Sequence, residues 1–188
     1  MKKAAIALLV LLMILGCNSM FSKLFKKAQK PVEPAEVYNG LRNQILSLKP
    51  SDAGIEPSSE MPNVWGVLME TGYPQAVVTL VSLADGTTSL YFSNGGGMIG
   101  GGQHITVAQA SKSFVAAAEN YYQQMTLTES FLSPAIGRVK FYVLTYSGIY
   151  TIDVDENELG NRKHELSPLF YYGQDVITQF RIVQEQKK

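Results

Sequence analysis

The sequence predicts an α+β domain in which one antiparallel sheet of about five strands is covered by helices. Two observations predict this class. Short runs rich in β-branched and aromatic residues fall into two groups, and tight-turn sequences link the runs within each group. Apolar residues at helical spacing lie before, between and after these groups. The expected order of elements is therefore α-β-β-β-α-β-β-α.

The strands are expected where apolar runs end in turn residues. Gly72-Tyr73-Pro74 and Asp85-Gly86 join the first three strands, and Asp85-Gly86 is the strongest short hairpin signal in the chain. Ser147-Gly148 joins the other two. Each group should pair in sequence order as an antiparallel meander. The expected strands cover residues 64–71, 76–83, 87–93, 138–146 and 149–154.

The helices are expected from apolar faces and from start and stop signals. The first should end before Pro50, and the last should start at Ser167-Pro168, a hydroxyl cap followed by proline. Gly173 is expected to break or bend this last helix. The buried face of the first helix is expected to consist of Val37, Leu41, Ile45 and Leu48. The helices should cover 35–48, 107–125 and 167 onward, with a polar loop at 155–163.

The N-terminus has the layout of an export signal. It begins Met-Lys-Lys, continues with an apolar stretch, and reaches Ile14-Leu15-Gly16-Cys17. The apolar segment from Ala4 to Gly16 has 13 residues, whereas a spanning helix needs about 20. Residues 1–17 resemble bacterial lipoprotein signals. The resemblance implies removal of residues 1–16, acylation of Cys17, and a place in the cell envelope, on the outer side of the cytoplasmic membrane or on the outer membrane. An uncleaved apolar anchor is the alternative.

Cys17 is the only cysteine, so the chain can form no internal disulfide and no other thiol can serve as a nucleophile. Residues 17–34 form a tether whose Lys23, Lys26, Lys27 and Lys30 either attract anionic headgroups or belong to a flexible polar spacer. One α+β domain is expected over 35–188. Without residues 1–16 the chain has 14 basic and 16 acidic residues, a balance that excludes a strong field for nucleic acid.

The most unusual segment of the domain is a glycine loop at residues 94–104, between a strand and a helix. It has three interpretations: a structural loop where backbones approach closely, an anion or small-ligand cradle of amide groups, or a mobile flap that contacts a partner. Six glycines in eight positions produce a G-x-G-x-x-G pattern almost unavoidably, and no Lys-Ser/Thr follows, so no nucleotide cofactor is expected. The candidate ligand-binding residues are Gly95, Gly96, Gly97, Gly100, Gly101, Gly102 and His104.

A catalytic set is not evident in the sequence. His104 and His164 are 60 residues apart, no third zinc ligand stands at a recognisable spacing, and Ser93 lacks the G-x-S-x-G context. The acidic run from Asp153 to Glu158 lacks the calcium-loop spacing and is expected to be a solvated hairpin end. Most aromatic side chains are expected in or beside the core, although a tyrosine stripe that binds sugar or peptide is an alternative. The aromatic residues considered are Trp65, Tyr121, Tyr122, Tyr142, Tyr171 and Tyr172.

Two resemblances bear on the domain itself. Residues 90–102, 138–146 and 166–173 (Leu-Ser-Pro-Leu-Phe-Tyr-Tyr-Gly) are similar to a set of small bacterial proteins of unknown function, over most of 62–183. The element order resembles profilin-like and roadblock-type folds by analogy alone. Neither resemblance implies a catalytic residue. The expected function is a non-catalytic envelope lipoprotein that binds a protein partner or stabilises an assembly. The alternatives are small-ligand or anion binding by residues 94–104, and an enzyme that uses His104.

Overall fold

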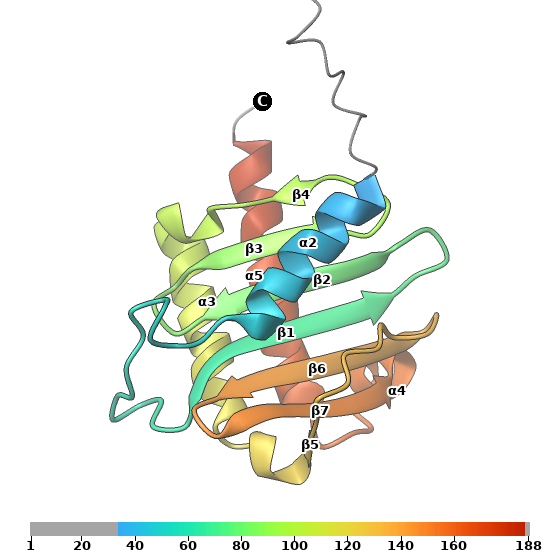
Figure 1. The fold of residues 1–188 in the computed structure, drawn as a ribbon. Helices are drawn as coiled ribbons and strands as arrows, with labels where there is room; N and C mark the ends of the chain where they lie inside the picture. Colours follow the sequence, from blue (N-terminus) through green and yellow to red (C-terminus); the bar gives the residue numbers. More distant parts are fainter. Residues whose placement is uncertain (1–33, 187–188) are drawn as a thin grey trace, which may run out of the picture. The chain divides into compact units, whose positions relative to one another are not determined.

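One antiparallel sheet of seven strands organises the computed structural model, which describes residues 34–186 (Figure 1). The strand order is β4-β3-β2-β1-β6-β7-β5, and all strand pairings are antiparallel. The predicted class, α+β with a single antiparallel sheet, is therefore confirmed. The strands are β1 (Val64–Gly72), β2 (Val77–Leu83), β3 (Thr88–Phe92), β4 (Gly97–Met98), β5 (Thr126–Leu127), β6 (Arg138–Thr145) and β7 (Gly148–Asp155).

The sheet is larger than predicted, and the order of elements differs. The five expected strands are present, but β4 and β5 each add a strand of two residues at an outer edge of the sheet. Two residues carry no periodicity, so the sequence pattern could not reveal them. A short helix, α4 (Glu156–Gly160), replaces part of the expected polar loop. The order that suggested profilin-like and roadblock-type folds is thus not the observed one.

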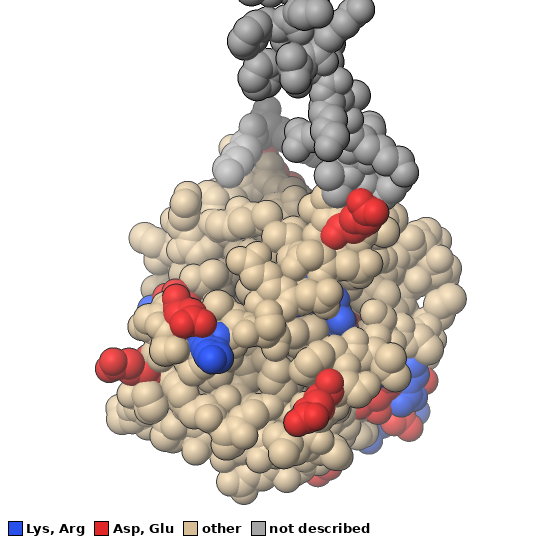
Figure 2. All heavy atoms as spheres, in the orientation of Figure 1, with Lys and Arg blue, Asp and Glu red and all other residues tan. Residues whose placement is uncertain are grey.

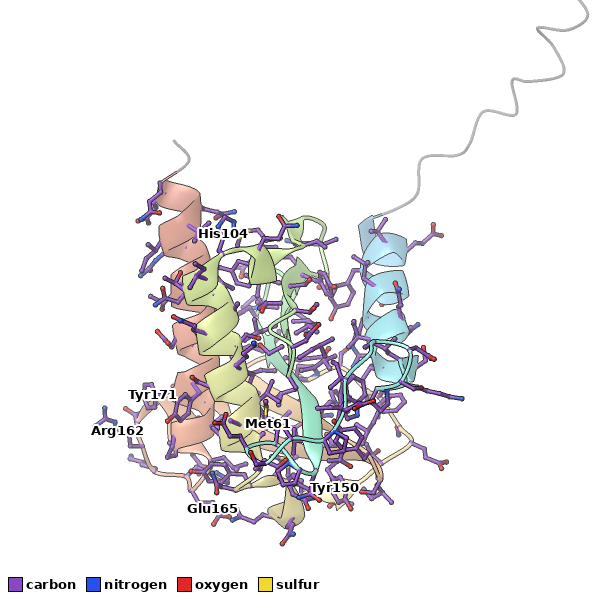
Figure 3. All side chains as sticks on the ribbon, turned by 90° about the vertical axis from the view of Figure 1, so that its left-hand side faces the viewer. Met61, His104, Tyr150, Arg162, Glu165 and Tyr171 are labelled. Atoms are coloured by element: carbon purple, nitrogen blue, oxygen red, sulfur yellow. The ribbon has the colours of Figure 1, made fainter. Side chains whose placement is uncertain are left out.

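Helices cover both faces of the sheet. Helix α2 (Pro34–Ser47) lies on one face, and α3 (Ile105–Ala118) and α5 (Ser167–Glu185) lie together on the other (Figures 1 and 3). Helix α3 ends earlier than predicted, because the chain tightens after Ala118 into turns that lead to the 3₁₀ turn Tyr122–Gln124. Helix α5 continues through Gly173 without a break. A Cβ there would lie 2.6 Å from the Met69 sulfur, so glycine allows α5 to approach β1 closely.

Two cores result, one on each side of β1, whose nine residues are all buried. Val67 and Met69 enter the larger core under α3 and α5, which also contains Phe114 and Phe180. Trp65 and Leu68 belong to the smaller core under α2. Because both faces of its central strand are covered, the domain has a three-layer arrangement of helix, sheet and helices.

The buried face of α2 is the predicted one only in part. Three of the four predicted residues are partly buried and pack against the smaller core: Leu41, Ile45 and Leu48. Val37 is 49% exposed, whereas Tyr38, Arg42 and Leu46 are buried. The buried positions are spaced by four residues, as expected for one helix face, but they include a charged side chain. A search for apolar residues alone therefore found residues that border the buried face, but it missed the charged side chain within that face.

Arg42 forms a buried ion pair with Glu70 at the centre of the sheet. Its Nε donates to Glu70 Oε1 at 2.6 Å, and its Nη2 donates to Oε2 at 2.9 Å. Thr79 Oγ1 donates to Oε1 at 3.0 Å and is joined to the Tyr38 hydroxyl by a 2.8 Å hydrogen bond. Arg42 Nη1 donates to the Phe131 carbonyl at 2.9 Å. The network thus connects α2, β1, β2 and the segment before β6.

Burial and the charges of this network together set the protonation of its members and of Tyr142, whose ring centre lies 5.6 Å from the Arg42 guanidinium carbon. Burial by itself lowers the pKa of Arg42, but the hydrogen bond to Glu70 and the charge of that carboxylate raise it above its ordinary value. Burial raises the pKa of Tyr142 to about 12, and the charge of Glu70 acts in the same direction. Burial likewise raises the pKa of Tyr38. At neutral pH the guanidinium is therefore charged and the two phenols are neutral.

Replacing Arg42 by Met should lower the free energy of unfolding by about 3–5 kcal/mol, because the Glu70 carboxylate would stay buried without its counter-ion. Urea unfolding followed by the fluorescence of Trp65, the only tryptophan, measures this loss. The double variant Arg42→Met/Glu70→Leu should recover most of the loss, since it removes both charges.

Arg138→Met is the matched control. Arg138 pairs with Asp153 at 2.7 Å, but both side chains are more than one-third exposed. A solvated pair contributes at most about 1 kcal/mol. An Arg42→Met loss no larger than that of Arg138→Met would show that the buried pair does not hold α2 on the sheet.

Candidate functional site

The predicted anchor lies outside the described residues. This applies to Cys17, to the predicted signal at 1–16, and to the predicted tether except Pro34. Across the stretch from 34 to 186, the structure contains no helix long and apolar enough to span a bilayer. The lipoprotein interpretation stays a prediction.

The first half of the glycine loop covers the outer edge of β3. Gly95 N–H donates to the Phe92 carbonyl at 2.9 Å, and the chain then returns as β4, where Gly97 pairs with Tyr91. Gly95, Gly96 and Gly97 have φ values of 106°, 84° and 140°, which side-chain-bearing residues rarely adopt. A covered edge cannot pair with a strand of another chain, so this half of the loop protects the sheet.

The second half of the loop packs closely against the body of the domain. A Cβ on Gly101 would lie 2.3 Å from the ring of Phe180, and one on Gly102 would lie 2.4 Å from the Gly86 carbonyl oxygen. These distances leave no room for a side chain. Gly101 and Gly102 therefore have the close approach that the structural interpretation requires.

A small hollow lies on each side of the loop, and Gly100 lines both. One, of about 290 Å³, is bounded by His104, Met98 and Phe180. The other, of about 260 Å³, is bounded by Asp85 and Gln103 among others. The backbone N–H groups of Gln103 and His104 donate to the carbonyls of Gly100 and Gly101. Two of the N–H groups expected to bind an anion are therefore already hydrogen-bonded within the loop. Binding by this loop stays a prediction.

The two histidines lie at opposite ends of α5. His104 lines the hollow beside Phe180, near the end of the helix. His164 lies just before the start of the helix, where its Nδ1 accepts the Leu166 N–H at 3.1 Å. Helix α5 has 19 residues, a length of about 28 Å. The histidines therefore belong to separate sites.

The acidic run is used in local contacts. Asp153 pairs with Arg138 and Lys140, and Asp155 caps α4 by accepting the N–H groups of Asn157 and Glu158. Glu156 accepts the Tyr73 hydroxyl at 2.9 Å. Within the described part of the chain, no group of three His, Cys, Asp or Glu residues is placed to hold a metal ion.

Ser93 also has a structural contact. Its Oγ accepts the N–H of Val77 at 2.8 Å, which helps to align β2 with the end of β3. A hydroxyl engaged in this way, with neither histidine in contact with it, is not arranged as an activated nucleophile.

A surface whose tyrosines the sequence suggested only as an alternative, within a wider binding stripe, surrounds the first turn of α5. Two hollows of about 490 and 500 Å³ share Pro168. Tyr171 lines the first hollow and Tyr172 the second, and their side chains are 39% and 45% exposed. We call the set formed by Tyr121, Arg162, Pro168, Tyr171 and Tyr172 the aromatic surface.

The aromatic surface is held in place by specific contacts. The Tyr171 hydroxyl donates to the Gly160 carbonyl at 2.6 Å, and the Arg162 guanidinium carbon lies 5.3 Å from the centre of the Tyr171 ring (Figure 3). Arg162 has φ 57°, uncommon for a side-chain-bearing residue, where the chain leaves α4. The backbone N–H of the next residue, Lys163, closes that turn by donating to the Glu158 carbonyl at 2.9 Å.

The sequence held one signal for this surface. Tyr171 and Tyr172 are consecutive in a helix whose apolar face contains Val176 and Phe180. At about 100° per residue, Leu169, Phe170, Val176 and Phe180 fall on one side of α5, and Tyr171 and Tyr172 fall outside that side. The expectation that they lie in or beside the core was wrong for these two exposed residues.

Comparison of the chain with protein-family models, with curated proteins and with solved structures finds no significant match. Any functional proposal for this chain therefore rests on its sequence and on the geometry of the described residues.

Gly101→Ala should destabilise the domain more than Gly96→Ala. The added methyl at 101 would meet the buried Phe180 ring, an overpacking that costs about 1–3 kcal/mol or more. The methyl at 96 would meet open space, so only the strain of φ 84° is expected, about 1–2 kcal/mol. Urea unfolding of both variants gives the comparison. Equal losses, or a larger loss at 96, would contradict the close packing at Gly101.

Proposed function

We propose that this protein is a lipid-anchored envelope protein whose domain is a non-catalytic binding module for a protein partner. The aromatic surface is the observation that carries the proposal. Exposed tyrosines beside an arginine are the side chains most enriched at the energetic centres of protein interfaces. The N-terminal resemblance to lipoprotein signals supports the anchor.

The placement of reactive groups supports a binding role over a catalytic one. The two histidines belong to separate sites, Ser93 is engaged in the sheet, and the acidic run is used in caps and ion pairs. A nucleophile and a base within hydrogen-bond distance of each other are the usual signature of nucleophilic catalysis. This separation disfavours an enzyme that uses His104.

Charge disfavours nucleic acid as the partner. Residues 34–186 contain 8 basic and 15 acidic residues. On the face over α2, charged side chains of both signs are few and scattered (Figure 2). A phosphate backbone needs a concentrated basic surface, so a protein partner fits these residues better.

The second candidate is a small-ligand site at the glycine loop. It is favoured by the 290 Å³ hollow, in which His104 faces a wall formed by Phe180 and loop glycines. The hollow is at the lower limit of the size that holds a small ligand. A protein partner at the aromatic surface is favoured because the hollows there are larger and their rim is aromatic.

Cys17→Ser should release the protein from the membrane fraction into the soluble fraction, because serine cannot carry the thioether-linked lipid. Fractionation of cells that express the full chain measures this, with Ser19→Ala as the control in the same segment. Full retention of Cys17→Ser in the membrane would indicate an uncleaved apolar anchor instead.

Tyr172→Ser should abolish recovery of one specific partner from detergent-solubilised membranes while the anchor and the fold are kept. The tyrosine is half-exposed, so its loss should change unfolding little, whereas removal of an interface anchor typically weakens binding by about 2 kcal/mol or more, roughly thirtyfold. Val37→Ser, an exposed apolar residue on α2, is the matched control and should retain the partner. Recovery of the wild-type protein alone at native concentration would overturn the binding proposal.

A further inference from the structure

Two isoleucines in and next to the glycine loop are strongly exposed to solvent. Ile99 and Ile105 are 71% and 75% exposed, and only Leu132 is as exposed among the large apolar side chains of the described residues. Ile99 lies in the loop between β4 and the 3₁₀ turn Gly101–Gln103, and Ile105 is the first residue of α3. We call the part of the domain that carries them the isoleucine end.

The segment that carries both isoleucines has no formal charge, although Glu36 at the start of α2, Asp85 beside the loop and Glu185 at the end of α5 lie nearby. From Tyr91 to Ser111 it contains no Asp, Glu, Lys or Arg, although acidic residues outnumber basic ones in the described domain. The negative surface of a bilayer repels acidic groups within about one Debye length. An uncharged, apolar segment is the part of an acidic domain that can approach such a surface at the lowest electrostatic cost.

The chain outside the structure joins the domain at the same end. Pro34, where α2 begins, lies at the end of the domain that also carries β4 and the final turn of α5 (Figures 1 and 3). In sequence, Lys23, Lys26, Lys27 and Lys30 precede Pro34, and Lys187 and Lys188 follow α5. In the sequence, basic residues therefore occur on both sides of the described domain.

We propose that the isoleucine end docks on the lipid bilayer, with Ile99 and Ile105 inserted at the level of the headgroups. The inference rests on the proposed lipid anchor, since the anchor supplies the high local concentration that two side chains need. Apolar side chains of interfacial segments enter the boundary of headgroups and acyl chains, and the attraction of lysines to anionic lipids adds to their binding. The positive-φ glycines before Ile99 and at Gly100 let the loop project this side chain away from the sheet.

Docking fixes the orientation of the domain. Helix α5 runs from the aromatic surface to the isoleucine end, so one end of this helix faces the lipid and the other faces away from it. The aromatic surface is then presented to a partner on the side opposite the membrane.

The test uses full-length protein reconstituted in vesicles of phosphatidylethanolamine and phosphatidylglycerol. Ile99→Cys and Ile105→Cys are labelled with a polarity-sensitive fluorophore, and quenching by lipid-attached bromine is measured. Acylated Cys17 does not react with the label, and mass spectrometry of the protein shows whether it is acylated. Leu132→Cys is the matched control, equally exposed but located in the segment before β6.

Quenching at positions 99 and 105 but not at 132 is the expected result. Adding Ile99→Ser to the chain labelled at 105 should then reduce the quenched fraction, with docking weakened roughly tenfold. Protein that is acylated and retained on vesicles, but unquenched at 99 and 105, would overturn docking and leave the anchor intact. Equal quenching at 132 would also overturn docking. A blue shift of the fluorophore that occurs without vesicles and rises with protein concentration would overturn it too, because a second copy of the chain would then cover the isoleucines. Protein that is neither acylated nor retained, and not quenched, would overturn both the anchor and docking.

Discussion

The buried pair of Arg42 and Glu70 is the constraint on which the α2 side of the domain depends. A carboxylate at the centre of a fully buried strand is costly unless a cation and hydrogen-bond donors reach it. Arg42 donates to it from α2, and Thr79 donates to it from β2. The Phe131 carbonyl accepts a further hydrogen bond from the guanidinium. A shift of α2 along the sheet would leave these groups unsatisfied. Its position is therefore set by polar contacts, while the surrounding aromatic and aliphatic side chains provide most of the burial.

The long strands could be predicted from the sequence because their β-branched runs and turns act locally. The Asp85-Gly86 turn, for example, forms with Gly86 at φ 94° and its N–H bonded to the Leu83 carbonyl. What could not be predicted depends on partners far along the chain. The burial of Arg42 requires Glu70, and the helical Gly173 requires the contact of α5 with Met69. Neither partner is visible in the local pattern of its element.

The same limit applies to the candidate sites. A glycine-rich sequence indicates close backbone approach without naming what is approached, and the partner of Gly101 is Phe180 on another helix. The loop was found from sequence because its composition is unusual. The aromatic surface has ordinary composition, and it arises because the α4 to α5 turn places Arg162 over Tyr171. A tyrosine stripe could be suggested from the sequence, but the place of Arg162 over Tyr171 becomes visible only when the turn geometry is known.

The two proposed surfaces together limit where a partner can be met. Between Cys17 and Pro34 lie 16 residues. With the proposed lipid on Cys17, this segment, fully extended, would let the domain move at most about 60 Å from the bilayer. A domain held only by that tether would present the aromatic surface in every direction. With the isoleucine end on the lipid, the length of α5 places this surface about 30 Å above the headgroups. The number of accessible orientations falls, and with it the entropy lost when a partner binds. A partner fixed in the same envelope layer would then bind more tightly to the docked domain without any additional contact.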